Sequence, residues 1–183
     1  MKIINLGEKN SLLNRYIAEL RDVVIQKDSM RFRRNLERIG EIFAYEISKT
    51  LTYSRKEVET PLGIANCNLS DDKIVLSTIL RAGLPLHQGL LNYFDKAENS
   101  FIAAYRKYGK DNKFTIQLEY ASTPSVENKI VIISDPMLAT GASAVLAYDR
   151  LLESGTPIHT HFVCPVASKY GIDYLSKNLP HKK

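Results

Sequence analysis

The sequence predicts an α/β domain with a mostly parallel central sheet that helices cover on both faces. From Lys73 onward, short β-rich runs alternate with helical stretches, as in strands joined by crossover helices. The strongest run, Ile130–Ser134, is almost continuously β-branched, which is typical of a strand buried on both faces. With 183 residues, 44% of them apolar and 25% charged, the chain suits one such domain better than two.

Strands of this sheet are expected where β-branched and apolar residues form short runs between turn signals. These runs are residues 74–79, 101–105, 130–134 and 158–164. Residues 114–120 alternate in period two, which predicts one strand of a projecting antiparallel arm. The Thr-Pro-Leu-Gly break at 60–63 predicts a turn or a strand start, because proline cannot donate to a central ladder.

Helical periodicity dominates the N-terminal segment, about residues 1–55 of a single domain expected over 1–183. Apolar residues at helical spacing predict one helix over 11–27 and a second from Phe32 to Ile47, with arginines between the apolar positions. Further helices are expected to follow three of the strands, at residues 84–94, 142–153 and 170–177.

Charge and composition limit the classes of ligand. The net charge of +5 fits an anionic ligand such as phosphate or nucleic acid, and equally a solvated basic surface. Cys67 and Cys164 are too few for a disulfide framework or a four-cysteine zinc site, and a buried structural thiol is expected at Cys164. His159 and His161 share one face of a strand, but the sequence offers no third metal ligand beside them.

The compartment expected from the sequence is the cytoplasm, with no membrane partner. No apolar run approaches the roughly 20 residues that cross a bilayer. The N-terminus also lacks the long apolar stretch and small-residue cleavage site of a secretory signal.

The turn after the strongest strand is the best candidate site, because ligands of open α/β sheets bind beyond the carboxyl ends of the strands. It reads Asp135, Pro136, Met137, Leu138, Ala139, Thr140, Gly141, Ala142 and Ser143. Small residues let a backbone approach a phosphate, amides at a helix start point towards it, and the two hydroxyls add donors. The acid at the strand end can accept hydrogen bonds from sugar hydroxyls. From spacing alone, a helix cap beside a turn glycine is an equal interpretation.

The exact string narrows this choice. Residues 130–143 resemble the phosphoribosyl diphosphate (PRPP) signature of the type I phosphoribosyltransferases. The Asp-Pro-Met-Leu-Ala-Thr-Gly form is similar to the uracil phosphoribosyltransferase family in particular, since most of the superfamily has two adjacent acids where this chain has Asp135 and Pro136.

Other segments resemble the same family in the same order, so that the resemblance runs over most of the chain. Residues 79–84 are similar to its diphosphate loop, Tyr105-Arg106 to the start of its flexible arm, and residues 57–61 to its early strand. The flanking segments that also fit are Arg31-Phe32-Arg33, Tyr45-Glu46, Val166-Ala167 and Gly171-Ile172.

The resemblance implies a type I phosphoribosyltransferase fold and a reaction in which uracil displaces diphosphate from PRPP to give uridine monophosphate. It implies Asp135, Arg81 and Arg106 as catalytic residues, with Asp135 holding the ribose hydroxyls and the arginines binding phosphate oxygens. It implies that Arg81, Arg106 and residues 135–143 bind PRPP, with 139–143 around the 5′-phosphate. Mg2+ is expected as cofactor, held mainly by PRPP and not by protein side chains. A homodimer or larger homo-oligomer and a GTP effector are expected partners.

Three departures from the family pattern bear on the expected site. Ala142 stands where a second glycine is usual, and its methyl group can crowd a phosphate or oppose a positive φ. Residues 107–113 differ from the usual arm sequence but stay basic. After Gly171-Ile172 the family continues with a strand and a glycine-rich segment that forms much of the uracil pocket. We expect the printed chain to lack that C-terminal segment, so base specificity rests on the resemblance.

Alternatives to a uracil enzyme remain open at this point. One is a phosphoribosyltransferase for another base. Another is a PRPP-binding regulatory or non-catalytic protein of the same fold, such as a nucleotide-responsive regulator of RNA. The Asp-Pro form of the loop argues against the regulator, and no nucleic-acid partner is expected.

Overall fold

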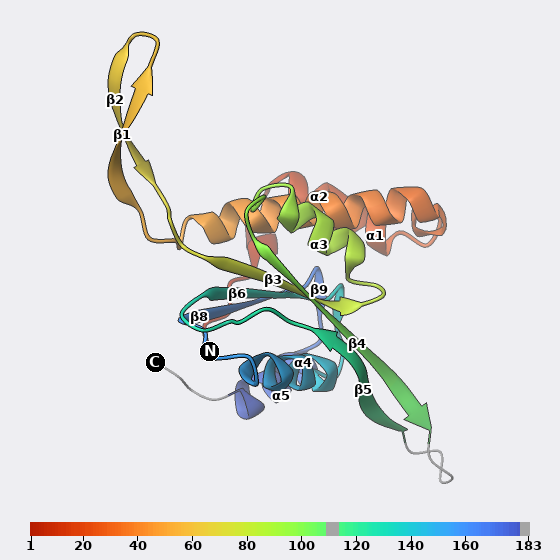
Figure 1. The fold of residues 1–183 in the computed structure, drawn as a ribbon. Coiled ribbons are helices and arrows are strands. Elements are labelled where there is room, and N and C mark those ends of the chain that lie inside the picture. Colours follow the sequence, from red (N-terminus) through yellow and green to blue (C-terminus); the bar gives the residue numbers. More distant parts are fainter. Residues whose placement is uncertain (109–113, 180–183) are drawn as a thin grey trace.

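The computed structural model describes residues 1–108 and 114–179, and gives only the backbone of residues 104–108 and 114–119 (Figure 1). A five-stranded sheet in the order β5-β4-β3-β6-β8 forms its centre. Its strands are β3 (Ile74–Leu80), β4 (Glu98–Tyr108), β5 (Phe114–Ser122), β6 (Ile130–Ser134) and β8 (His159–Val163). β3 runs parallel to β4 and β6, and β6 runs parallel to β8, which confirms the predicted α/β class.

The antiparallel partner in this sheet is β5, which pairs with β4. Figure 1 shows the two strands extending together beyond the body of the molecule. The predicted projecting arm is therefore confirmed, and β4 is longer than the predicted strand because it supplies one half of that arm.

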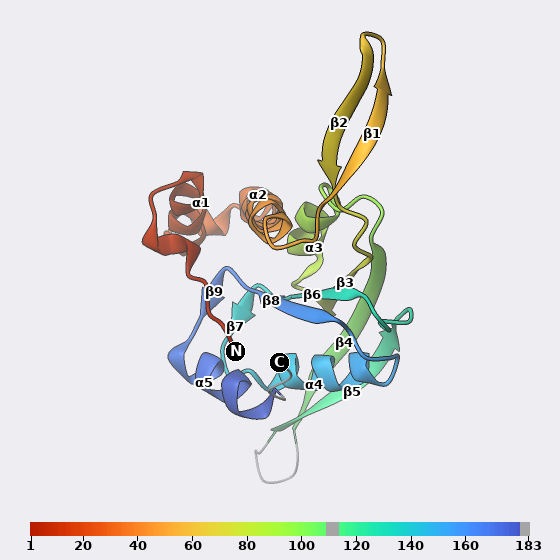
Figure 2. The same cartoon turned by 90° about the vertical axis from the view of Figure 1, so that its left-hand side faces the viewer.

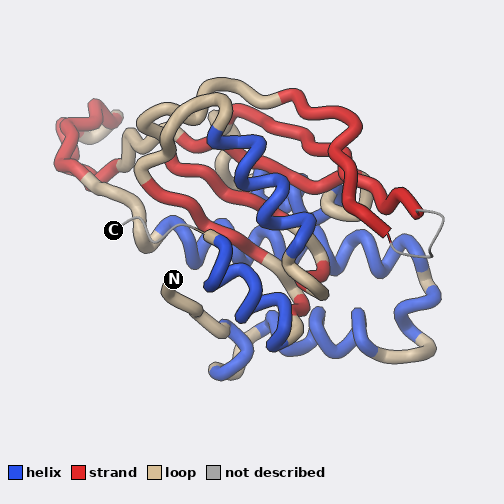
Figure 3. Tube along the Cα trace, turned by 90° about the horizontal axis from the view of Figure 1, so that it is seen from below, coloured by secondary structure: helices blue, strands red, loops and turns tan. Residues whose placement is uncertain are grey.

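Helices cover both faces of the sheet (Figure 2). On one face lie α1 (Leu12–Arg21), α2 (Ser29–Ser48) and α3 (Leu84–Leu91), with the short 3-10 helices η1 (Leu6–Glu8) and η2 (Ile25–Lys27). On the other face lie α4 (Ala142–Leu152) and α5 (Lys169–Asn178), and Figure 3 views the molecule from that side. No helix in the part of the chain that the structure describes has the length and apolar character needed to cross a membrane.

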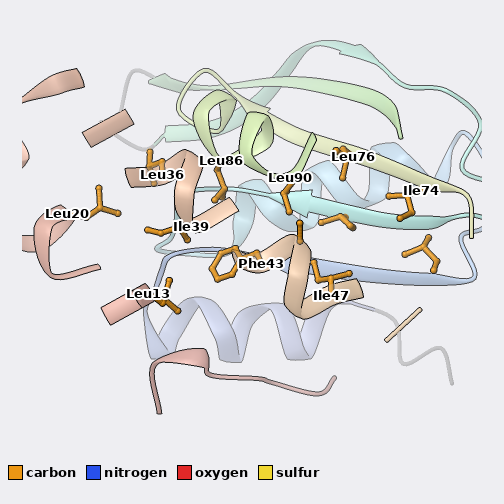
Figure 4. Close-up of a cluster of buried hydrophobic side chains, with 13 residues drawn as sticks. Leu13, Leu20, Leu36, Ile39, Phe43, Ile47, Ile74, Leu76, Leu86 and Leu90 are labelled. Atoms are coloured by element: carbon orange, nitrogen blue, oxygen red, sulfur yellow. The ribbon is translucent and has the colours of Figure 1, made fainter. Parts of the chain in front are cut away.

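The central strands alternate between two hydrophobic cores, because successive side chains of a strand point to opposite faces. Ile130 and Ile132 of β6 belong to the core beneath α2 and α3, which Figure 4 shows. Val131 and Ile133 belong to the core beneath α4. Burial on both faces explains why this strand is apolar without interruption in the sequence.

The predicted helix over residues 11–27 is wrong in its second half, since α1 ends at Arg21. Asp22 adopts an extended backbone, and its carboxylate accepts hydrogen bonds from the amides of Val24 and Ile25 at 2.8 and 2.9 Å. A short polar side chain that binds nearby amides in this way competes with continuation of a helix.

Between α2 and β3 along the chain, a β-hairpin projects away from the body of the molecule (Figures 1 and 2). It consists of β1 (Ser54–Thr60) and β2 (Gly63–Leu69), paired antiparallel from Ser54 with Leu69 to Thr60 with Gly63. The predicted turn at 60–63 is its tip. The sequence did not predict the second strand, because its half-buried residues Ala65 and Cys67 are small while Ile64 and Leu69 are exposed.

Two glycines allow α2 and α3 to approach closely. A Cβ at Gly40 would lie 2.3 Å from the carbonyl oxygen of Leu86, and a Cβ at Gly89 would lie 1.9 Å from that of Glu37. Because both obstacles are backbone atoms, neither can move aside without displacing a helix. The contact fixes α3, and thereby the loop that precedes it, against the body of the protein.

We expect Gly89→Ala to lower the free energy of unfolding by about 2 kcal/mol, because overpacking α2 against α3 outweighs the better helix propensity of alanine. Urea denaturation followed by circular dichroism measures this change. The exposed neighbour Gln88→Ala is the matched control and should stay within about 0.5 kcal/mol of wild type. Equal stability of the two variants would contradict the close helix contact.

Candidate functional site

Two loops meet at the carboxyl edge of the sheet. β3 and β6 are parallel neighbours whose last paired residues are Thr78 and Ser134, so the loops that follow them leave the sheet side by side. The Thr78 hydroxyl donates a hydrogen bond to the carbonyl oxygen of Ser134 at 3.3 Å. Gly83 is buried against this junction, since an added Cβ would lie 2.0 Å from the Thr78 Oγ1 and 3.3 Å from the Ser134 oxygen. The structure thus joins the predicted diphosphate and 5′-phosphate loops.

Asp135 follows β6 directly and is half-buried. Its amide donates to the carbonyl oxygen of Val163 at 3.2 Å, and its Oδ1 accepts from the amide of Met137 at 3.4 Å. Burial raises the pKa of the Asp135 carboxyl group, and the Met137 amide opposes this rise. The side chain is thus held at the strand end with acceptor capacity left for the hydroxyls of a ligand.

The loop from Asp135 turns into α4 at Gly141, whose φ of +80° places it in the left-handed region that favours glycine. Gly141 is the N-cap residue and offers no side-chain cap to the helix. The amides of Ala142, Ser143 and Ala144 form the first turn, where a helix has no internal acceptors for them. The Thr140 hydroxyl is 3.5 Å from the first of these amides. Such an arrangement can bind an anion.

Ala142 does not meet the conformational difficulty that the sequence suggested. It is the first residue of α4, and the positive φ falls on Gly141 before it. A methyl group at this position is therefore compatible with the observed backbone, and only its proximity to a bound phosphate bears on affinity.

The two predicted arginines differ in what the structure gives. Arg81 is exposed in the turn between β3 and α3, beside the loop that carries Asp135. Arg106 lies in β4 and pairs through its backbone with Ile116 in the arm, while its side chain falls outside the described residues. The sheet pairing of β3 and β4 ends at Leu80 with Ala103, so Arg106 lies further along the arm.

Sequence reasoning missed the elements that support the predicted phosphate loop, residues 135–143. β7 (Met137–Leu138) pairs in parallel with β9 (Val166–Ala167), and α5 begins just after β9. Ser168, the N-cap residue of α5, donates a hydrogen bond to the carbonyl oxygen of Ala139. The one signal in the sequence is a serine three residues before a glycine at the predicted start of a helix.

Cys164 borders this site as a half-buried thiol. Burial, and then the negative charge of Asp135, raise the pKa of Cys164 to about 12. The thiol therefore stays protonated, and it packs against the small core cluster formed by Leu138, Ala144 and Leu175. The predicted structural thiol is consistent with this position.

The histidine pair on β8 lies away from the loops. The rings of His159 and His161 are 4.5 Å apart between centroids, and the Nε2 of His161 is 3.5 Å from the Thr50 Oγ1. Among residues 1–108 and 114–179, no group of three His, Cys, Asp or Glu side chains is arranged to hold a metal ion. Burial, and then the proximity of His159, lower the pKa of His161 to about 4.

Comparison with known proteins identifies the family. Residues 8–183 match the family model for uracil phosphoribosyltransferase. The chain belongs to the uracil phosphoribosyltransferase family. It is 54% identical over 180 residues to the uracil phosphoribosyltransferase of Porphyromonas gingivalis, which covers 98% of this chain and 83% of the relative. The corresponding protein of Methanothermobacter thermautotrophicus is 38% identical over 148 residues, or 80% of this chain and 68% of the relative.

Solved structures support the same fold. The AQ2163 protein from Aquifex aeolicus superposes with a TM-score of 0.83 and 27% identity, over 97% of this chain and 82% of its own. A hypoxanthine phosphoribosyltransferase from Staphylococcus aureus gives a TM-score of 0.52 at 17% identity, over 75% of this chain and 65% of its own. The type I phosphoribosyltransferase fold predicted from the sequence is therefore confirmed, as is membership of the uracil phosphoribosyltransferase family within it.

We expect His161 to weaken the protein in mild acid. Its pKa in the folded state, about 4, lies below the ordinary 6.5, so the unfolded chain binds the proton more tightly. The stability that neutral His161 contributes is thus complete above pH 6.5 and is lost as the pH falls towards 4. Urea denaturation at several pH values should show a shallower acid loss in His161→Phe than in wild type. His159→Asn, the control, should keep most of the loss, since burial is the main cause.

Proposed function

We propose that the protein transfers the 5-phosphoribosyl group from PRPP to uracil, giving uridine monophosphate and diphosphate, as a pentosyltransferase of pyrimidine salvage. The observation that carries this proposal is the junction of two loops, one with Asp135 and an open helix start, the other with Arg81. Family membership indicates uracil as the base. We propose that the two loops bind the two ends of the sugar phosphate.

Each end of PRPP presents negative charge, which the two loops are suited to bind. The first-turn amides of α4 and the Thr140 hydroxyl would donate to the 5′-phosphate, assisted by the positive end of the helix dipole. Asp135 would accept hydrogen bonds from the ribose hydroxyls. Arg81, and Arg106 from the arm, would bind the diphosphate, because a guanidinium group can donate two parallel hydrogen bonds to phosphate oxygens.

Catalysis then consists of positioning and charge stabilisation. Departure of diphosphate leaves an oxocarbenium-like sugar, whose positive charge a carboxylate near the ribose stabilises, as in glycoside cleavage. Arg81 would stabilise the charge that develops on the leaving oxygens. Neither role requires a covalent bond to the protein.

Mg2+ is the expected cofactor, and we propose that it arrives bound to PRPP. Mg2+ sites of this kind commonly combine one or two carboxylates with substrate phosphates. Asp135 provides one carboxylate at the carboxyl edge of the sheet. It fits such a site because it would contact the ribose hydroxyls of the Mg2+-bound PRPP. When bound, the ion neutralises charge on the diphosphate. The residues of this chain orient the substrate around it.

A direct assay tests the proposal against its alternatives. Full-length protein with PRPP, Mg2+ and labelled uracil should form uridine monophosphate. Product from hypoxanthine or orotate in place of uracil would indicate another base. Absence of product with every base would favour the non-catalytic PRPP binder, and tight, salt-sensitive RNA binding would favour the regulator. Adding GTP to the uracil assay tests the predicted nucleotide effector.

We expect Asp135→Asn to lower kcat about 100-fold, because the amide cannot supply the negative charge beside the ribose. Asp149→Asn, at an exposed position on α4, should keep wild-type activity. Steady-state kinetics with PRPP and uracil measure both variants.

Arg81→Ala should raise the KM for PRPP and lower kcat in the same assay, and Arg21→Ala, at an exposed position of α1, is the control. Wild-type activity in both site variants would refute the assigned roles.

We propose that the protein assembles at least as a dimer, through surfaces that are unusually apolar for exposed positions. Val23 and Val24, between α1 and α2, are both 71% exposed, and Met30, in the first turn of α2, is 67% exposed. Leu62 at the hairpin tip is fully exposed. An isolated two-stranded hairpin is only marginally stable in water, so a covering partner would stabilise it. Light scattering at micromolar concentration should give at least twice 20.7 kDa, and a monomer would contradict the proposal. The cytoplasmic location remains a prediction.

A further inference from the structure

We propose that Ser168 is a positioning residue for the 5′-phosphate, which acts by holding the carbonyl of Ala139 against the start of α5. The inference rests on the proposed function, because it assigns a ligand to the loop that Ser168 supports. Ser168 lies on a different element from the loop, 29 residues further along the chain.

One serine makes three hydrogen bonds that tie the loop to α5. Its amide donates to the carbonyl oxygen of Leu138 at 2.9 Å, and its hydroxyl donates to that of Ala139. The same hydroxyl accepts from the amide of Gly171 at 2.9 Å. The side chain therefore uses its donor for the loop and its acceptor for the helix, and removing the Oγ atom breaks both connections at once.

Two glycines, Gly141 and Gly171, allow the loop and α5 to approach closely at this contact. A Cβ at Gly171 would lie 2.8 Å from the Leu138 oxygen and 2.9 Å from the Ala139 oxygen. A Cβ at Gly141 would lie 3.0 Å from the Gly171 oxygen. The backbones of the loop and of the first turn of α5 are thus in close contact, and the hydroxyl of Ser168 forms a hydrogen bond to each of them.

The direction of these carbonyls decides what the loop presents to a ligand. The oxygens of Leu138 and Ala139 both point to Ser168, which turns them away from a phosphate that they would repel. Because a peptide is planar and trans, fixing the carbonyl of Ala139 also fixes the direction of the next amide, that of Thr140. An anion site of backbone amides depends on such orientation, so loss of the Ser168 hydroxyl should weaken phosphate binding without removing any group that touches phosphate.

Ser11 provides a matched control. It caps α1, a helix of 10 residues like α5, and its hydroxyl accepts from the amide of Leu13 at 3.2 Å. Ser11→Ala and Ser168→Ala both remove the capping hydroxyl of a 10-residue helix, but only the second removes a bond to the phosphate loop. Ser168→Thr keeps the hydroxyl, and the exposed, extended backbone of Ser168 accommodates the added methyl group.

Calorimetric titration with two probes separates the proposed effect from general destabilisation. Ribose 5-phosphate tests the 5′-phosphate loop, and diphosphate with Mg2+ tests the loop of Arg81. We expect Ser168→Ala to raise the Kd for ribose 5-phosphate about five- to tenfold, as for the loss of one net hydrogen bond. The Kd for diphosphate should stay unchanged. Ser168→Thr and Ser11→Ala should bind both probes as wild type does.

The outcomes are distinct. If wild type binds ribose 5-phosphate and Ser168→Ala binds it equally well, or if Ser11→Ala loses as much affinity, the role of Ser168 is refuted. An equal loss for both probes in Ser168→Ala also refutes it, since that result indicates general damage. If wild type binds neither probe nor PRPP, the proposed function itself fails.

Discussion

The parallel pairing of β3 with β6 is the constraint on which the candidate site depends. It ends at Thr78 and Ser134, so that two loops distant in the sequence leave the sheet at adjacent points. A shift of this register by one residue would turn every side chain of one strand to the other face and displace one loop along the sheet relative to the other. Because Ile132 packs in one core and Val131 in the other, such a shift would also exchange the side chains that fill the two cores, which close packing opposes. Packing of the sheet therefore fixes the relative positions of the two loops that form the candidate site.

The site places its functional groups on backbone that other elements hold. Gly83 is wedged against the ends of two strands, and Gly141 against α5. Both glycines occupy positions where any side chain would meet neighbouring atoms, so the loops have few alternative conformations. A site that stabilises charge by orientation gains from this rigidity, because its dipoles need little rearrangement when the charge develops.

Much of the fold was predictable because its signals are local. The uninterrupted apolar run of β6 and the glycine break before α3 are each visible within ten residues. The early end of α1 was not predicted, since it depends on Asp22 binding nearby amides in place of the helical pattern. The second strand of the β1–β2 hairpin was also missed, because its apolar residues Ile64 and Leu69 do not occupy its half-buried positions.

The candidate site also combines residues that the sequence predicted with residues that only the structure shows. Asp135 and the loop after it were predicted from a contiguous string, and the family they indicate is confirmed. Ser168 was not predicted as part of the site, because its importance comes from a contact between segments 29 residues apart. Local patterns in a single sequence do not indicate contacts between distant segments, so a three-dimensional structure is needed to find them.

The helix α4 has two attachments of different kinds. Its later residues Ala147 and Leu151 are almost fully buried in the core, whereas the amides of its first turn belong to the candidate phosphate site. Any ligand that binds this first turn only in the folded state therefore draws on the same cooperative unit as the core, and occupancy shifts the folding equilibrium by mass action. Cellular supply of the sugar phosphate would in that way act on the lifetime of the protein as well as on its turnover.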